Sequence, residues 1–175
     1  MPAADSGRST ADPLAALARR DLRGWRGLSP GTTVADVAAV FAVDREFAGA
    51  SPLGARFEPA EWMAASADAF PDGVRIWFRG EHVVLFDAQL ELDAPGDSLL
   101  AELGEPEARW DAALGPVPLA GSEWVYPDRG LTLYVDPETR RIDRLLAYEP
   151  TTLETYAAVA RPHTRVDPLP EGGGV

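Results

Sequence analysis

Hydrophobic residues recur with a helical period over the first third of the chain. The spacing over residues 12–23 predicts one helix, which the glycines that follow would end. Thr33 and Asp36 have the spacing of a capping box, and they therefore predict the start of a second, short helix. We expect a loop over residues 48–59 and a third helix over residues 61–69.

The hydrophobic period changes to two in the middle of the chain. Apolar and other residues alternate over residues 74–79, which predicts a strand with Arg75, Trp77 and Arg79 on one face. The chain then turns at a glycine and runs through a second apolar stretch, residues 83–86. This pattern predicts an antiparallel hairpin.

An aromatic-Pro-Asp turn that leads into a strand occurs twice. Residues 70–77 align with residues 126–134 with one inserted residue. A Pro-Gly pair and a predicted helix precede each copy, and a predicted hairpin follows it. We therefore predict an α+β fold of two similar halves, each a helix or helix pair packed on an antiparallel hairpin or sheet. Similar turn chemistry in two independent hairpins would give the same pattern, and this alternative stays open.

The predicted domain organisation follows from this repeat. Residues 1–11 are expected to be a disordered N-terminus, and residues 12–94 to form the first α+β half. The second half is expected over residues 95–160, with a closing helix that begins at Thr151. The proline- and glycine-rich residues 161–175 predict a flexible tail.

Two short motifs resemble a known repeat family. The helix start Gly31-Thr32-Thr33-x-x-Asp36-Val37 and the helix end Leu103-Gly104-Glu105-Pro106, with the hairpins behind them, are similar to the repeat shared by the outer-membrane assembly lipoprotein BamE (SmpA/OmlA) and the β-lactamase inhibitory protein. The resemblance covers about residues 28–148. It implies helical pairs packed on antiparallel strands and a function in binding other proteins.

Composition narrows the function classes. The 175 residues carry 16 basic and 28 acidic side chains, a net charge of −12, which argues against nucleic acid or an anionic membrane as the partner. The chain has no cysteine and no lysine, so thiolate and Schiff-base chemistry are excluded. The abundance of alanine, arginine, glycine and proline is typical of GC-rich bacteria such as actinobacteria. We expect a cytoplasmic protein, because we find neither a secretory signal nor a membrane span.

The strongest functional hint is the sheet face that carries Arg75, Trp77 and Arg79. The second copy of the turn places Tyr134 on the same face, and Trp124 lies just before it. Aromatic and arginine side chains supply much of the energy of protein interfaces. We therefore predict a non-catalytic protein-binding module that uses this face. Alternatively, the chain's own helices cover the face and the aromatic residues form a second core.

The partner is expected to be another protein with a basic patch, because the acidic chain would attract it electrostatically. Self-association through the same face is a further possibility. We expect no cofactor and no metal. The acidic cluster formed by Glu102, Glu105, Glu107 and Asp111 is interpreted as a solvated surface.

An enzyme is the alternative function. Asp87, Glu123 and His82 are the candidate catalytic residues of a small cofactor-free isomerase or cyclase with a cavity between sheet and helices. The two functions predict different surfaces: the binding module predicts an exposed aromatic patch, whereas the enzyme predicts an enclosed cavity that contains a carboxylate.

Overall fold

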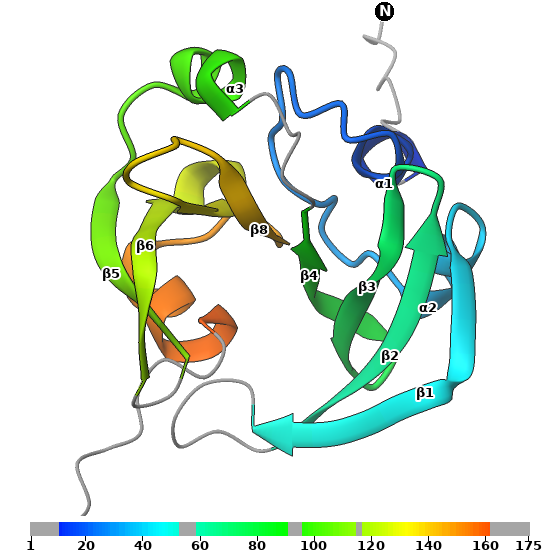
Figure 1. Cartoon of the computed structure of the whole chain (residues 1–175). Coiled ribbons are helices and arrows are strands. Elements are labelled where there is room, and N and C mark those ends of the chain that lie inside the picture. Colours follow the sequence, from blue (N-terminus) through cyan, green and yellow to red (C-terminus); the bar gives the residue numbers. More distant parts are fainter. Residues whose placement is uncertain (1–10, 53–58, 91–95, 115–116, 162–175) are drawn as a thin grey trace, which may run out of the picture.

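The computed structural model describes residues 11–52, 59–90, 96–114 and 117–161. The strands in this part of the chain form one eight-stranded antiparallel sheet in the order β1-β2-β3-β4-β8-β7-β6-β5 (Figure 1). In chain order the elements are α1 (Ala11–Ala18), α2 (Val34–Ala38), β1 (Ala42–Pro52), β2 (Pro59–Ala67), β3 (Phe70–Arg79), β4 (His82–Gln89), α3 (Gly96–Leu103), β5 (Ala108–Leu114), β6 (Val117–Tyr126), the 3₁₀ turn η1 (Pro127–Arg129), β7 (Leu131–Val135), β8 (Ile142–Ala147), α4 (Leu153–Thr155) and the π-helical turn η2 (Tyr156–Ala160).

The prediction of two α+β halves, each a helix packed on a hairpin, is wrong. β4 pairs with β8 from Phe86↔Ala147 to Gln89↔Arg144, so backbone hydrogen bonds run through the middle of the sheet without a break. The helices are short, and α2 has five residues. The strands form two meanders, β1–β4 and β5–β8. A continuous sheet forms because each strand pairs its backbone polar groups with those of a neighbouring strand, including where β4 lies beside β8. The predicted boundary at residues 94 and 95 lies outside the described residues.

Two predicted elements in the first meander are also wrong. The expected loop over residues 48–59 contains the end of β1, and the expected helix over residues 61–69 is mostly β2. Alanine-rich sequence favours helix, but here Trp62 pairs across the sheet with Trp77 and Met63 with Ile76. Tertiary pairing with β3 therefore overrides the local helical preference.

Other local predictions are confirmed. β3 and β4 form the expected hairpin, whose turn contains Gly80 at a φ of 60°. The capping box at the start of α2 is present, since Asp36 N donates to Thr33 Oγ1 and Thr33 N donates to Asp36 Oδ2. The closing helix begins one residue later than predicted: its cap is Thr152, which accepts from Thr155 N at 3.1 Å.

The repeated aromatic-Pro-Asp turn opens the third strand of each meander, β3 and β7. The two copies have different backbones. In the first copy Gly73 lies within β3 at a φ of 84°, whereas the second copy forms η1 and ends at Gly130 with a φ of 56°. The same motif therefore lies inside a strand in the first copy and before a strand in the second, so it does not specify one backbone conformation.

The sheet is curled and has a core on each face. Figure 1 shows α1 and α3 outside the curl and α4 inside it. Side chains from α1, α2 and α3 pack on one face, which we call the outer face, together with Ile76, Phe86 and Leu133. Tyr156 and Ala160 of η2 pack on the opposite, inner face. No helix in the described ranges is long and apolar enough to cross a membrane.

Candidate functional site

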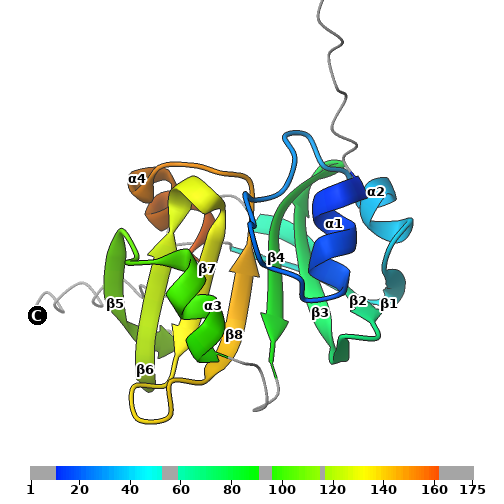
Figure 2. The same cartoon turned by 90° about the horizontal axis from the view of Figure 1, so that it is seen from above.

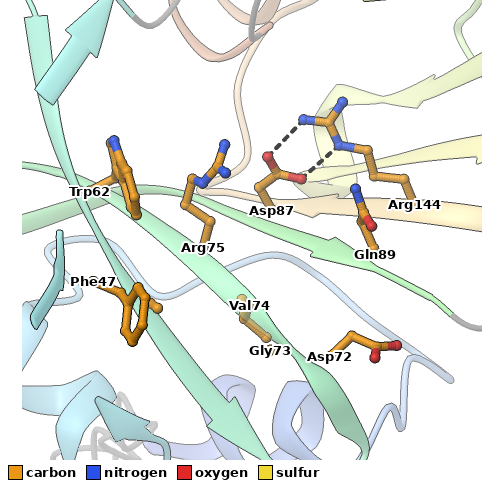
Figure 3. Close-up of a pocket in the computed structure, with 10 residues that line it drawn as sticks. Phe47, Trp62, Asp72, Gly73, Val74, Arg75, Asp87, Gln89 and Arg144 are labelled. Atoms are coloured by element: carbon orange, nitrogen blue, oxygen red, sulfur yellow. Dashed lines mark hydrogen bonds and ion pairs between the residues drawn. The ribbon is translucent and has the colours of Figure 1, made fainter. Parts of the chain in front are cut away.

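An open groove lies on the inner face, where the sheet curls between β1 and β8. It has a volume of about 840 Å³, within the range of small-ligand sites. Figure 3 shows its main side chains. Those that matter for recognition are Phe47 of β1, Trp62 of β2, Asp72 and Arg75 of β3, Asp87 and Gln89 of β4, and Arg144 of β8.

Arg75 is a fixed and exposed positive charge in this groove. Its guanidinium carbon lies 4.8 Å from the ring centroid of Trp62 and 5.9 Å from that of Trp77, so it makes cation–π contacts with both. Within the described residues, no acidic side chain forms an ion pair with Arg75. With respect to the described part of the chain, its hydrogen-bond donors are therefore available to a ligand.

The backbone at Gly49 makes room for Trp62. A β-carbon at Gly49 would lie 2.8 Å from Trp62 Nε1, closer than van der Waals contact allows. The indole therefore lies directly over the edge strand β1, and Arg75 lies over the indole. Phe47, 66% exposed, lies on the irregular part of β1 between Asp44 and Ala48 and adds a second aromatic wall.

Asp87 and Arg144 form a bidentate ion pair in the floor of the groove (Figure 3). Arg144 Nε donates to Asp87 Oδ1 at 2.6 Å and Nη2 donates to Oδ2 at 2.7 Å. Burial acts to lower the pKa of Arg144, but the hydrogen bonds and charge of Asp87 outweigh it, so that pKa lies above its ordinary value. Because Arg144 occupies both carboxylate oxygens, Asp87 is a structural anchor and not a free acid.

Glu123 anchors the C-terminal helical turn to the inner face. The Tyr156 hydroxyl donates to Glu123 Oε1 at 2.6 Å, and Arg161 Nε donates to Oε2 at 2.9 Å. The Glu123 side chain is 0% exposed. A carboxylate enclosed by the protein's own donors cannot reach a substrate, so this arrangement argues against Glu123 as the acid or base of the predicted enzyme.

The predicted binding face is only partly accessible. Arg75, Trp77 and Tyr134 lie on the inner face as the alternation predicted, but Trp77 is 1% and Tyr134 5% exposed. The expectation of an exposed patch at these aromatics is therefore wrong, and the alternative of a second core is confirmed for them. The prediction for Trp124 is wrong as well, because it packs in the outer-face core. Arg79 lies at the end of β3, beyond an irregularity after Trp77, and does not line the groove.

The three predicted catalytic residues are not brought together. His82 is exposed at the start of β4, and Asp87 lies five residues further along the same strand, roughly 16 Å away at the usual rise per residue. Glu123 belongs to the enclosed cluster on β6. Among the described residues, no three acidic or histidine side chains are grouped so that they could hold a metal.

Five groove residues used for recognition were not predicted as site residues, namely Phe47, Trp62, Asp72, Gln89 and Arg144. Phe47 lies outside every element that the sequence predicts and Trp62 lies inside a predicted helix, so neither was assigned to a sheet face. The signal that could have placed Trp62 is the alternation of residues 60–65, in which Met63 and Ala65 face the outer core. The pairing of Arg144 with Asp87 has no local signal, since it depends on β4 lying beside β8.

We expect all four tyrosines to resist ionisation while the chain is folded. Burial raises the pKa of Tyr156 well above its ordinary value, and those of Tyr126, Tyr134 and Tyr148 are also raised, mainly by burial. An unfolded tyrosine loses its proton near pH 10, so above that pH the unfolded state binds fewer protons than the folded one and stability falls. Absorbance at 295 nm should stay low at pH 10 and rise together with loss of the native circular dichroism signal. A phenolate signal in the intact fold near pH 10 would contradict this burial.

Comparisons with known proteins give no family for this chain. No protein-family model, curated protein or solved structure matches it. The resemblance to the BamE and β-lactamase inhibitory protein repeat therefore stays a prediction from the two sequence motifs.

Proposed function

We propose that the protein is a non-catalytic binding module that holds a segment of another protein in the inner-face groove. The observation that carries this proposal is Arg75, an exposed guanidinium fixed against Trp62 and facing an open groove without an acidic partner in the described chain. A rigid, solvent-facing arginine beside aromatic side chains is typical of the residues that dominate binding energy at protein interfaces.

The charges of the groove indicate what such a segment carries. Asp87 and Arg144 neutralise each other, which leaves Arg75 and the exposed Asp72 as the groove charges outside an ion pair among the described residues. They lie three residues apart along β3, with Gly73 in the left-handed conformation between them. A complementary segment therefore places an acidic side chain at Arg75, a basic one near Asp72, and an apolar one against Phe47 and Trp62.

The net charge of −12 affects the rate of association with a partner. It speeds the approach of a basic partner, whereas the fixed charges in the groove decide which segment stays bound. The cytoplasmic location expected from the sequence belongs to the same proposal. The enzyme alternative receives less support, because Arg144 occupies both oxygens of Asp87, the carboxylate closest to Arg75 in the strand register.

The test uses side chains that are exposed, since replacing the buried Trp77 or Tyr134 would disturb the fold. Tagged wild-type protein is used to capture partners from lysate of the source cells, and the partner is purified and titrated by calorimetry. We expect Arg75→Glu to weaken binding at least about tenfold, or 1.4 kcal/mol. Arg141→Glu, the same charge reversal at an exposed position outside the groove, should leave the affinity unchanged.

Two outcomes would overturn the proposal. One is that wild-type protein captures no partner, including a second copy of itself by size-exclusion chromatography. The other is that a purified partner binds wild type, Arg75→Glu and Arg141→Glu equally. A charge reversal on the partner that restores affinity for Arg75→Glu would identify the acidic residue that contacts Arg75.

A further inference from the structure

A second cavity lies on the outer face of the sheet, between the end of α1 and helix α3. Figure 2 shows both helices on the same side of the sheet, with β4 and β8 between them. The cavity has a volume of about 610 Å³, enough for a small organic ligand. It lies on the face opposite the inner-face groove, and the proposed function does not use it.

The floor of this cavity is apolar. Phe70 of β3 and Ile142 and Leu145 of β8 line it and are buried in the outer-face core. Leu90 and Leu99 line its sides and are only partly buried. Partly covered hydrocarbon around a cavity favours an apolar ligand, because binding removes that surface from water.

Arg20 lies at the edge of the same cavity, just after helix α1. Its φ of 54° is the left-handed conformation of a residue that ends a helix in a Schellman motif. Its Nε atom is buried and, in the part of the chain that the structure describes, donates to no acceptor. Buried donors almost always have a partner.

The cap of α1 fixes the backbone of Arg20. Arg20 N donates to Leu17 O at 2.9 Å, and Asp21 N donates to Ala16 O at 2.9 Å, so the end of α1 fixes the turn. The guanidinium carbon lies 5.0 Å from the ring centroid of Phe70, over the apolar floor. The structure therefore places an N–H group without an acceptor directly beside buried hydrocarbon.

The charges that line the cavity favour an anion. Arg19, Arg20 and Arg23 face two acids, Asp21 and Glu102, so the lining has a positive excess in a chain of strongly negative net charge. Asp21 lies 3.6 Å from Arg23, and both side chains are well exposed. No ion pair to either acid involves Arg20 among the described residues.

We propose that this outer-face cavity binds a small amphipathic carboxylate. The carboxylate accepts hydrogen bonds from the Arg20 guanidinium, and the hydrocarbon chain lies on Phe70, Ile142 and Leu145. A guanidinium matches a carboxylate in shape and charge.

The test titrates full-length protein with sodium decanoate below its micelle concentration and with 1-decanol, which has the same chain without the charge. Methyl NMR follows Ile142 in the cavity, and Ile76, which lies in the same core without lining the cavity, is the internal control. We expect saturable binding of decanoate to one site, with shifts at Ile142 and not at Ile76, and at least tenfold weaker binding of decanol.

Two variants and one matched control complete the design. Arg20→Gln should weaken decanoate binding at least tenfold, and Leu99→Trp should block it by filling the cavity from its side. Arg75→Gln, the same replacement in the inner-face groove, should bind decanoate as wild type does. Circular dichroism checks that each variant is folded, and Leu99→Trp keeps the test valid if Arg20→Gln does not fold.

Non-saturable decanoate binding, equal affinity of wild type and both cavity variants, or weakening only in Arg75→Gln would overturn the proposal. The last result would move the anion site to the inner-face groove. Because partner binding is tested through Arg75 and decanoate binding through Arg20, either proposal can fail without the other.

Discussion

Replacement of Gly130 by alanine is expected to destabilise the folded protein strongly, because the added methyl group would collide with backbone atoms. Gly130 has a φ of 56°, and a β-carbon there would lie far inside contact distance of the Tyr148 carbonyl oxygen and 3.0 Å from Gly27 Cα. Backbone atoms cannot rotate away as a side chain can. We expect Gly130→Ala to lose at least about 3 kcal/mol of unfolding free energy, measured by urea denaturation.

The obstacle at Gly130 is a junction of three chain segments. Tyr148 N donates to Gly130 O at 2.9 Å, and Leu28 N donates to Tyr148 O at 3.0 Å. Moving one segment to admit a methyl group would break the bond to the next. The turn after η1 is therefore fixed by the end of β8 and by the loop after α1.

Gly80→Ala is the matched control for this substitution. Gly80 has a similar φ of 60°, but its missing side chain would meet nothing within 4 Å. We expect it to lose only about 1 kcal/mol, the cost of the left-handed backbone alone. Equal losses of unfolding free energy in the two variants would show that collision with Tyr148 adds nothing to the effect of Gly130→Ala.

Replacement of Glu123 by alanine is the second change with a large expected effect. It removes the acceptor of the Tyr156 hydroxyl and the anion beside Arg161, whose side chain is 14% exposed. Removing one member of a buried ion pair destabilises proteins by several kcal/mol, and we expect about 3 kcal/mol here. Chemical denaturation followed by tyrosine and tryptophan fluorescence measures the loss.

A double-mutant cycle separates the ion pair from simple loss of packing. Arg161→Ala alone leaves Glu123 as a buried anion with the Tyr156 hydroxyl as its remaining described donor. The double variant should therefore lose less than the sum of the single variants. Glu138→Ala, at an exposed turn, should change stability by less than about 0.5 kcal/mol. Additive losses at Glu123 and Arg161 would contradict the coupling that the structure shows.

Local sequence was sufficient to predict some of the elements around these positions. The alternation around Arg75 and the glycine turn at Gly80 predicted the β3–β4 hairpin, because side-chain period and turn chemistry are properties of a few consecutive residues. The Thr33–Asp36 capping box could be predicted for the same reason. By contrast, the composition of β2 predicts a helix, whereas its pairing partner β3 determines its conformation.

In the candidate site, too, local sequence predicted some features and tertiary structure determined the others. Alternation placed Arg75 and Trp77 on one face, and that placement was correct. It could not show that Trp77 is covered while Arg75 is exposed, since coverage depends on the curl of the sheet and on distant segments. Nor could it show that Arg144 neutralises Asp87, because those residues are 57 positions apart in the chain.

The sequence by itself determined the face of each residue in the well-patterned strands, the acidic character of the chain and the absence of thiol and lysine chemistry. Only the tertiary structure decided that eight strands join into one curled sheet, that its inner face is part core and part groove, and that Gly130 must lack a side chain. The physical reason is range: local pattern acts through neighbouring residues, whereas burial, ion pairing and close backbone approach arise between segments brought together by folding.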